Sequence, residues 1–339
     1  MVSNGVRRPL WRNGPGVPLT TPFKAGLDEI DHQALAKQVV RCAKAGINIV
    51  LLGTTGEASH LSNAERKAAV VTARRALDDA GLQDAPLLVG TGGGSLQTTL
   101  ELTQEAADAG ASHAIVILPG YFSFAMRNDR QAILDFFKGV MDRSPLPVMI
   151  YNFPGAAGGI DMSSDELSEL ADHDNCFGVK LTCGNIGKGH RIANYVRSAE
   201  YKKRKGAYLD SVVEGGDFQI LPGFSDTLLS ALTAHHTGCI TSTGALFPKT
   251  IRRLYDQGLK GLAGDQAAFN EARQLQDRIA RSDGIAVATS FQGAKHFLDH
   301  FVEQGLGGEC RLPLGKIDEK TKRKVEEALK EDVEFENSL

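Results

Sequence analysis

Long apolar runs and paired cysteines are scarce in this 339-residue sequence, and each shortage excludes a class of protein. No run approaches the roughly 18 to 20 apolar residues that a membrane-spanning helix needs, and no secretory-type apolar segment follows the first residues. The five cysteines are odd in number and contain no C-x-x-C pair, which argues against a disulfide framework and against a thiolate zinc site. We therefore expect a soluble protein of a reducing compartment, with no membrane partner.

An excess of charge of either sign is also lacking. Lys and Arg total 38 against 41 Asp and Glu, a net charge of -3. Such a balance does not favour electrostatic capture of nucleic acid. With 42% hydrophobic and 23% charged residues the composition is that of a globular protein. The expected partner is a small molecule.

The first fourteen residues form a segment of their own. They contain Arg7, Arg8 and Arg12 and no acidic residue, a composition that faintly resembles a mitochondrial transit peptide. The commoner interpretation is a surface arm, and Trp11 favours an arm that docks on the fold. We expect a cytoplasmic protein with an N-terminal arm, and keep mitochondrial import as the alternative.

Short apolar runs alternate with longer segments of helical period along most of the chain. Unbroken apolar runs suit strands buried on both faces, and strict alternation with helices predicts parallel pairing. Eight such units predict a (β/α)8 TIM barrel. An open doubly wound sheet is the alternative, but no G-x-G-x-x-G follows the first run. The expected strands cover residues 17–21, 47–52, 86–89, 114–118, 147–151, 177–180, 218–221 and 239–242; the expected helices between them cover 31–45, 63–80, 96–109, 129–141, 164–171 and 225–235.

After residue 242 the pattern is helical only, which predicts a C-terminal helical extension over 246–256, 264–281, 285–304 and 318–331. The expected organisation is an arm (1–14), a barrel (15–245), and the final barrel helix with the extension (246–339). The basic segment 198–216 is interpreted as a solvated insertion rather than an import signal.

In such a barrel the active site lies at the carboxyl ends of the strands, which directs attention to Lys180 and Tyr151. Burial among apolar neighbours disfavours the ammonium form of a lysine, and the neutral amine is a nucleophile toward a ketone carbonyl. A phenol beside it could transfer the protons that an imine-forming enzyme must move. The alternatives for each residue alone are a snorkelling lysine and a core tyrosine.

The turn Gly53-Thr54-Thr55-Gly56-Glu57 follows the second expected strand. Its glycines allow backbone N–H groups to approach an anion, and its hydroxyls add donors, so it suits a small carboxylate.

For the other residues with possible chemistry we expect structural roles. His296 and His300 stand four apart but lack the zincin glutamate, so no metal site is expected. Cys183 is expected to be a small buried residue, with a reactive thiol as the alternative. The glycine run 90–94 lacks the Lys-Ser/Thr of a phosphate loop and is interpreted as a tight turn.

With these residues in view, the sequence resembles the dihydrodipicolinate synthase and N-acetylneuraminate lyase family of class I aldolases. The matching motifs are Leu19-Thr20-Thr21-Pro22-Phe23, Gly53-Thr54-Thr55-Gly56-Glu57, Pro119-Gly120-Tyr121, Tyr151-Asn152-Phe153-Pro154 and Gly178-Val179-Lys180 with Thr182 and Gly184.

The resemblance implies roles for individual residues. Lys180 would form a Schiff base with pyruvate or a 2-oxo acid, and Tyr151 would carry protons. Thr55 and Tyr121 would complete the relay, with Tyr121 reaching in from a neighbouring subunit of a homotetramer. No other cofactor and no metal are implied. The 2-oxo acid carboxylate would be held by Gly53, Thr54 and Thr55, and the rest of the substrate by Thr182, Gly223, Ser225, Asp226, Ile240 and Ser242.

One departure from the family pattern bears on the substrate. Synthases that condense pyruvate with aspartate semialdehyde have an arginine at the position of Ala156, where it would bind a second carboxylate. Alanine cannot make that salt bridge. We therefore expect a lyase that cleaves a 2-oxo-3-deoxy sugar acid or a 4-hydroxy-2-oxo acid to pyruvate and an aldehyde. The alternatives are the synthase and a non-catalytic pyruvate-binding paralogue.

Overall fold

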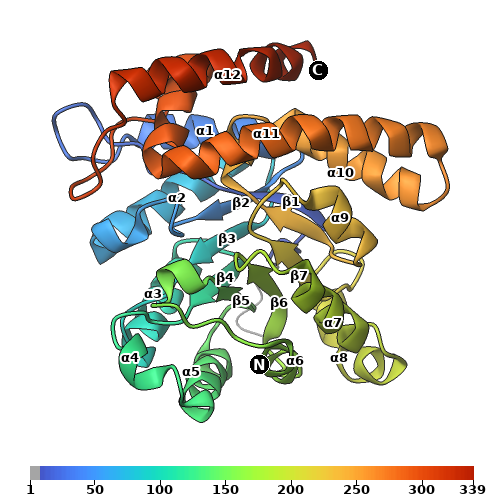
Figure 1. The fold of residues 1–339 in the computed structure, drawn as a ribbon. Helices are drawn as coiled ribbons and strands as arrows, with labels where there is room; N and C mark the ends of the chain where they lie inside the picture. The colour runs from blue at the N-terminus through green and yellow to red at the C-terminus, as the bar shows by residue number, and fades with distance from the viewer. Residues whose placement is uncertain (1–7) are drawn as a thin grey trace. The chain divides into compact units, whose positions relative to one another are not determined.

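The computed structural model describes residues 8–339, shown as a ribbon in Figure 1. Arg7 of the expected arm lies outside the described residues. Eight strands form one sheet in the order β7-β6-β5-β4-β3-β2-β1-β8. The strands are β1 (Gly14–Pro18), β2 (Asn48–Leu51), β3 (Leu87–Gly90), β4 (His113–Ile117), β5 (Val148–Asn152), β6 (Cys176–Leu181), β7 (Gln219–Pro222) and β8 (Gly238–Ile240).

Helices connect the strands in the expected alternation. Those before β8 are α1 (His32–Lys44), α2 (Asn63–Asp79), α3 (Leu96–Asp108), α4 (Ser123–Met126), α5 (Arg130–Arg143), α6 (Ser164–Ala171), α7 (Ile186–Val196), α8 (Ala199–Val212) and α9 (Leu228–Thr233). After β8 come α10 (Pro248–Leu262), α11 (Gln266–Phe297) and α12 (Glu319–Ser338). Four short turns of helix complete the list: η1 (Ala58–His60), η2 (Pro154–Ala156), η3 (Ser242–Ala245) and η4 (Leu298–Val302). The fold is thus the expected (β/α)8 barrel with a C-terminal helical extension.

The chain divides into two compact units, which do not follow the order of the sequence. The first unit contains residues 8–13, Gln83–Gly223 and Ser230–Cys239, and the second contains Gly14–Leu82, Phe224–Leu229 and Ile240–Leu339. Each is described by itself below.

In the first unit, strands β3 to β7 pair in parallel, and nearly all their residues are buried. The unbroken apolar runs of the sequence therefore arise because helices cover the outer face. Trp11 is fully buried, and its indole N–H donates to Gln219 Oε1 over 3.1 Å. Arg8 also donates to Pro145 O over 3.0 Å, so the described part of the arm docks on the fold.

In the second unit, β1 pairs in parallel with β2, and α11 packs along α10 (Figure 1). The helices begin at side-chain caps, such as the capping box of Ser62 and Glu65 before α2. No helix among residues 8–339 is both long and apolar enough to span a membrane.

Two expectations on the helices were wrong. Segment 198–216 is not simply a solvated insertion, because α8 buries Tyr201, Lys205 and Leu209 along one face. The expected helix break at 282–284 is absent: α11 continues through it, and its non-helical residue is Ser290, with φ 56° and ψ -150°.

Candidate active site

Lys180 and Tyr151 lie side by side in the first unit. They are register partners on the adjacent parallel strands β6 and β5, and only 6% and 7% of their surfaces are exposed. The Lys180 Nζ atom lies 4.3 Å from the centre of the Tyr151 ring. The structure therefore brings the expected nucleophile and the expected proton carrier together, near the carboxyl ends of their strands.

The end of β5 is held by its own neighbours. The Tyr151 ring stacks on Phe153, with 5.7 Å between the ring centres. The Asn152 side chain donates to Asp161 over 2.7 Å and accepts from the Met162 N–H over 3.1 Å. These contacts fix the direction of the strand, and with it the position of the Tyr151 phenol.

Thr182 and Gly223 extend the same edge of the first unit. The Thr182 N–H donates to Asn152 O over 3.0 Å, and the Gly223 N–H donates to Leu181 O over 3.1 Å. A Cβ atom on Gly223 would lie 2.1 Å from Thr182 Oγ1, so a side chain there would displace the hydroxyl. Among the described residues this buried hydroxyl has no hydrogen-bond partner. An unpartnered buried hydroxyl is a suitable substrate contact.

Tyr121 differs from Lys180 and Tyr151 in exposure. It is 85% exposed, and the nearby Phe122 and Phe124 are 56% and 71% exposed. The Tyr121 and Phe122 rings meet edge to face with 5.0 Å between their centres. A relay role through a neighbouring subunit stays a prediction.

In the second unit, the motif Gly53–Glu57 is a compact turn between two left-handed residues, Leu52 just before it and Glu57 at its end. Leu52 has φ 55° and Glu57 has φ 50°. The Glu57 N–H donates to Thr54 O over 3.1 Å, and the Thr21 hydroxyl donates to Gly56 O over 2.7 Å. Left-handed non-glycine residues are strained, typically by about 1–3 kcal/mol, so surrounding contacts must hold this turn in place.

Asp283 of α11 organises the segments that contain Ser225, Asp226 and Ser242. Its buried carboxylate accepts from the Ser225 N–H over 3.0 Å and from the Asp226 N–H over 3.2 Å. It also accepts from the hydroxyl groups of Thr241, over 3.1 Å, and of Thr243. One carboxylate therefore fixes both segments.

The expected binding residues of these segments are not equally accessible. Ser225 is fully buried, with its hydroxyl 3.2 Å from that of Thr241, and Ile240 is also fully buried. Asp226 is exposed and Ser242 is partly exposed. Partial burial, and then the Asp283 charge, raise the pKa of Asp226. Asp226 and Ser242 are thus better placed than Ser225 and Ile240 to meet a ligand directly.

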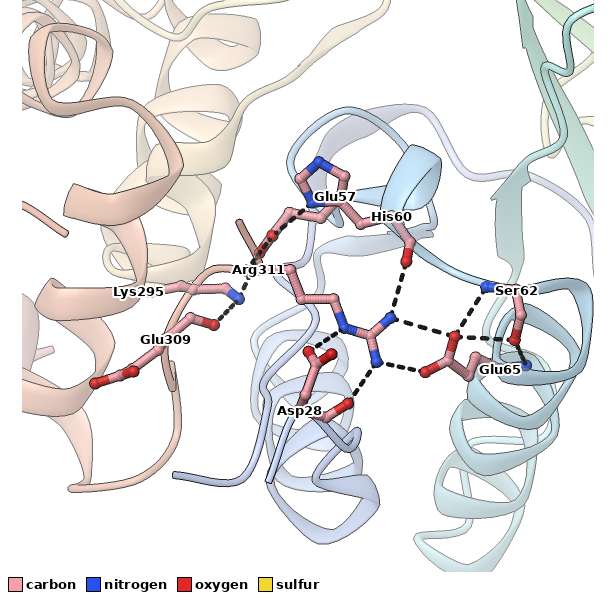
Figure 2. A network of polar contacts seen from close by, with 8 residues as sticks. All are labelled: Asp28, Glu57, His60, Ser62, Glu65, Lys295, Glu309 and Arg311. Carbon is pink, nitrogen blue, oxygen red and sulfur yellow. Dashed lines mark hydrogen bonds and ion pairs between the residues drawn. The ribbon is translucent and has the colours of Figure 1, made fainter. Parts of the chain in front are cut away.

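Sequence reasoning missed three buried charged groups of the second unit. Asp283 falls where a helix break was expected, and Lys295 lies in a segment considered only for its histidines. Glu57 belongs to a motif that carries the resemblance, but the resemblance implies no role for this residue. Figure 2 shows Glu57 paired with Lys295, beside Arg311. For Asp283 and Lys295, the available signal was a charged residue within a helix of otherwise apolar spacing.

Other groups with possible chemistry lie elsewhere. His296, His300 and Glu326 have ligand atoms within 4.8 Å of one another. Glu326 Oε1 lies 2.6 Å from His296 Nε2 and 3.4 Å from His300 Nδ1, so these side chains join α12 to the end of α11 and to η4. Cys183 is partly exposed, and the expectation that it is buried was wrong.

Comparison with known proteins identifies the family of this chain. The family model described as "Dihydrodipicolinate synthetase family" matches residues 13–332. An L-threo-3-deoxy-hexylosonate aldolase from Aspergillus niger is 32% identical, with 96% of this chain and 97% of the relative covered. A probable mitochondrial 4-hydroxy-2-oxoglutarate aldolase from Emericella nidulans is 33% identical, with the same coverage.

Solved structures show the same fold. A protein of the dihydrodipicolinate synthase family from Coccidioides immitis superposes with a TM-score of 0.80 at 28% identity, covering 98% of this chain and 99% of that one. A prophage protein of this family from E. coli K12, solved in complex with pyruvate, gives a TM-score of 0.78 at 25% identity, covering 94% and 98%.

The chain is thus a (β/α)8 barrel with a buried lysine beside a tyrosine on neighbouring strands, near the strand ends where such barrels place their active sites. Within this class of barrels, the chain belongs to the dihydrodipicolinate synthetase family.

Proposed function

We propose that this protein is a class I aldolase, a carbon–carbon lyase that reversibly cleaves a 2-oxo-3-deoxy sugar acid or a 4-hydroxy-2-oxo acid to pyruvate and an aldehyde. The observation that supports it most is the pairing of Lys180 with Tyr151, both buried and 4.3 Å apart from amine to ring centre. The aldolase names of the relatives from Aspergillus niger and Emericella nidulans support the same class.

The reaction would proceed through an imine on Lys180. The neutral amine attacks the C2 carbonyl of the 2-oxo acid, and loss of water leaves a protonated imine. Tyr151 removes the proton of the C4 hydroxyl while the C3–C4 bond breaks, and the electron pair of that bond flows into the imine to give an enamine. The aldehyde departs, the enamine takes a proton at C3, and hydrolysis releases pyruvate. Because the protonated imine is the electron sink, the proposal includes no metal and no further cofactor.

The remaining roles follow from the resemblance. Gly53, Thr54 and Thr55 would hold the carboxylate of the 2-oxo acid, and Thr55 with Tyr121 would relay protons. Contacts to the aldehyde half would come from Thr182, Gly223, Ser225, Asp226, Ile240 and Ser242. We include the homotetramer as part of the proposal, because the 85% exposed Tyr121 ring suits a contact with a second copy. Light scattering of the purified protein would measure the assembly.

The aldehyde half distinguishes this proposal from the synthase activity. Ala156 lies on η2 and is exposed, and its methyl group cannot bind a carboxylate. Cleavage of a six-carbon 3-deoxy-2-oxo acid between C3 and C4 leaves glyceraldehyde, and cleavage of 4-hydroxy-2-oxoglutarate leaves glyoxylate. We expect condensation of pyruvate with one of these to exceed condensation with aspartate semialdehyde. The reverse order would establish the synthase activity instead.

The location that we propose is the cytoplasm. The name of the relative from Emericella nidulans includes the word mitochondrial, which makes the mitochondrion the competing location. Microscopy of the full chain with a fluorescent protein fused after Leu339 distinguishes the two.

The deciding experiment is borohydride reduction in the presence of pyruvate, followed by peptide mass spectrometry. We expect the reduced adduct on Lys180 in the wild type and no adduct in Lys180→Ala, with circular dichroism showing that both are folded. Folded wild-type protein without an adduct would exclude the imine mechanism with pyruvate and favour the non-catalytic paralogue.

A further inference from the structure

The structure assigns a positioning role to a buried ion pair, Glu57 with Lys295, which holds the turn Gly53–Glu57 in the conformation that binds the carboxylate of the 2-oxo acid. This inference rests on the proposed function, and it adds two residues to which neither the resemblance nor the named relatives give a role.

The pair is buried almost completely. The side chains of Glu57 and Lys295 are 0% and 1% exposed, and Lys295 Nζ lies 2.5 Å from Glu57 Oε1. Lys295 Nζ also donates to Glu309 O over 2.7 Å and lies 4.5 Å from the centre of the Phe23 ring. The ammonium thus meets a carboxylate, a carbonyl and an aromatic face, which together compensate for its removal from water.

The second oxygen of Glu57 is also engaged. Glu57 Oε2 accepts from the Arg311 N–H over 3.0 Å and lies 3.2 Å from His60 Nδ1. Burial is the main cause that raises the pKa of Cys310 to about 11, and the charge of Glu57 and a hydrogen bond with it act in the same direction. The thiol is therefore protonated at neutral pH. Glu57 is thus held by α11, by the segment 309–311 and by its own turn.

Arg311 connects this cluster to the start of α2 (Figure 2). Its guanidinium donates to His60 O over 2.8 Å, to Asp28 Oδ1 over 2.6 Å and to Glu65 Oε1 over 2.5 Å. The hydrogen bond from Arg311 is the main cause that lowers the pKa of Glu65 to about 2. Glu65 also closes the capping box with Ser62. Both ends of the segment 57–65 are therefore fixed by charged groups from distant parts of the sequence.

The position of Glu57 explains why such an anchor is needed. Glu57 is a non-glycine residue in the left-handed region, with φ 50° and ψ 36°, two residues after Thr55 of the turn. Glycine would take this conformation without steric strain, whereas glutamate needs surrounding contacts to keep it there. A glutamate here supplies what glycine lacks, a carboxylate that anchors the turn to Lys295.

Loss of either charge should loosen the turn without altering the nucleophile. Removing one partner leaves the other charge buried and unpaired, which favours an opened turn with that charge in water. The backbone N–H groups that, in the proposed function, hold the carboxylate then lose their fixed geometry. Lys180 belongs to the other unit and keeps its place on β6. The effect should therefore appear in the binding of the 2-oxo acid more than in the chemical step.

The experiment measures borohydride trapping of pyruvate on Lys180 at varied pyruvate concentration. For Glu57→Gln, Lys295→Met and the double variant, we expect the half-saturating pyruvate concentration to rise at least tenfold and the maximal trapping rate to stay within threefold. Because the two residues act as a pair, the double variant should be no worse than the poorer single variant. The control is Lys316→Met, a 70% exposed lysine paired with Glu309, for which no change is expected.

The possible outcomes separate this inference from the proposed function. A wild type that traps no pyruvate contradicts the proposed function itself. A wild type that traps pyruvate, with variants of unchanged half-saturation and a lower melting temperature, shows that the pair is merely structural and overturns the inference. If Lys295→Met does not fold, Glu57→Gln decides, because the amide preserves the shape of the side chain.

Discussion

Lys180 Nζ lies over the face of the Tyr151 ring, 4.3 Å from its centre, because the two residues are register partners on β6 and β5. Both side chains start from paired strands rather than from a flexible loop, which favours a fixed arrangement of the two.

The phenol of Tyr151 should contribute to turnover more than to stability. For Tyr151→Phe we expect a fall in kcat of about 10² to 10⁴, the usual contribution of a positioned acid–base group, with a melting temperature close to that of the wild type. Steady-state release of pyruvate measures it. Tyr195→Phe, which removes a hydrogen bond to Asp172 at the surface, is the control and should keep full activity. Equal rates for the two variants would remove Tyr151 from the mechanism.

Ala156 should control the choice of aldehyde. Ala156→Arg places a guanidinium on exposed η2, where we expect it to increase condensation of pyruvate with aspartate semialdehyde relative to glyceraldehyde by about tenfold, the effect of roughly 1.4 kcal/mol. Competition between the two aldehydes, read by mass spectrometry, gives the ratio directly. Ala156→Gln, which adds a polar but uncharged side chain, should leave the ratio unchanged. An unchanged ratio in the arginine variant would show that this position does not face the aldehyde.

Asp283 should act on the aldehyde half alone. In Asp283→Asn the charge that accepts from the Ser225 and Asp226 N–H groups is lost, so we expect KM for the aldehyde to rise about tenfold, as hydrogen bonds to charged groups contribute about 1.5–3 kcal/mol. Trapping of pyruvate on Lys180 should be unaffected. The control is Asp332→Asn, another buried carboxylate that contacts α11, through Arg278 and Ser282. An equal rise in KM for the control would show that the rise in Asp283→Asn comes from general destabilisation.

Stability should fall as the pH drops below about 6.5. Burial, and then the charges of His190 and His235, together lower the pKa of His236 to about 4; burial is also the main cause that lowers the pKa of His113 to about 4. Between pH 4 and the unfolded value near 6.5, the unfolded chain binds more protons than the folded one, so the free energy of unfolding decreases with falling pH.

The variant His236→Leu tests this sign. Within the described residues neither ring nitrogen of His236 has a hydrogen-bond partner, so leucine sacrifices no such contact. Urea unfolding at pH 7 and at pH 5 should show a smaller difference in stability for the variant than for the wild type. An identical difference would mean that His236 does not titrate with folding.

Trp11 should be needed for stability although it lies in the N-terminal arm. Its indole is fully buried, donates to Gln219 and lies 6.2 Å from the Phe177 ring, centre to centre. We expect Trp11→Ala to lower the free energy of unfolding by about 3–5 kcal/mol, the usual cost of such a truncation. Chemical denaturation measures it. Arg12→Ala, whose ion pair with Glu214 is exposed, should cost less than about 1 kcal/mol.

The strands could be predicted because each is apolar on both faces, and the observed bounds differ from the expected ones by only a few residues. Helix α8 could not, because its buried face of Tyr201, Lys205 and Leu209 includes a lysine that interrupts the apolar pattern. Its ammonium is buried by donating to His173 O and by lying 4.4 Å from the Tyr208 ring centre. Only the folded chain reveals such compensation.

The residues of the candidate site also fall into those that the sequence predicts and those that it does not. Lys180 and Tyr151 end apolar runs, so their chemistry stands out in the sequence. Asp283 and Lys295 act on turns far away in the sequence, and their helical spacing says nothing about what they contact. The contacts of Ser225 could not be predicted either. Its N–H and the Thr241 hydroxyl both donate to Asp283 of α11, and its own hydroxyl lies beside that of Thr241.

Helix α11 contributes both Asp283 and Lys295, and this limits how its length can change. Each residue added to an α-helix rotates everything beyond it by about 100°. One extra residue between Asp283 and Ser290 would turn either the carboxylate or the ammonium away from its partners. One added at the exposed start of α11 would leave both in place. Insertions and deletions in this helix should therefore be found before Asp283 and not between Asp283 and Lys295, even where substitutions are tolerated throughout.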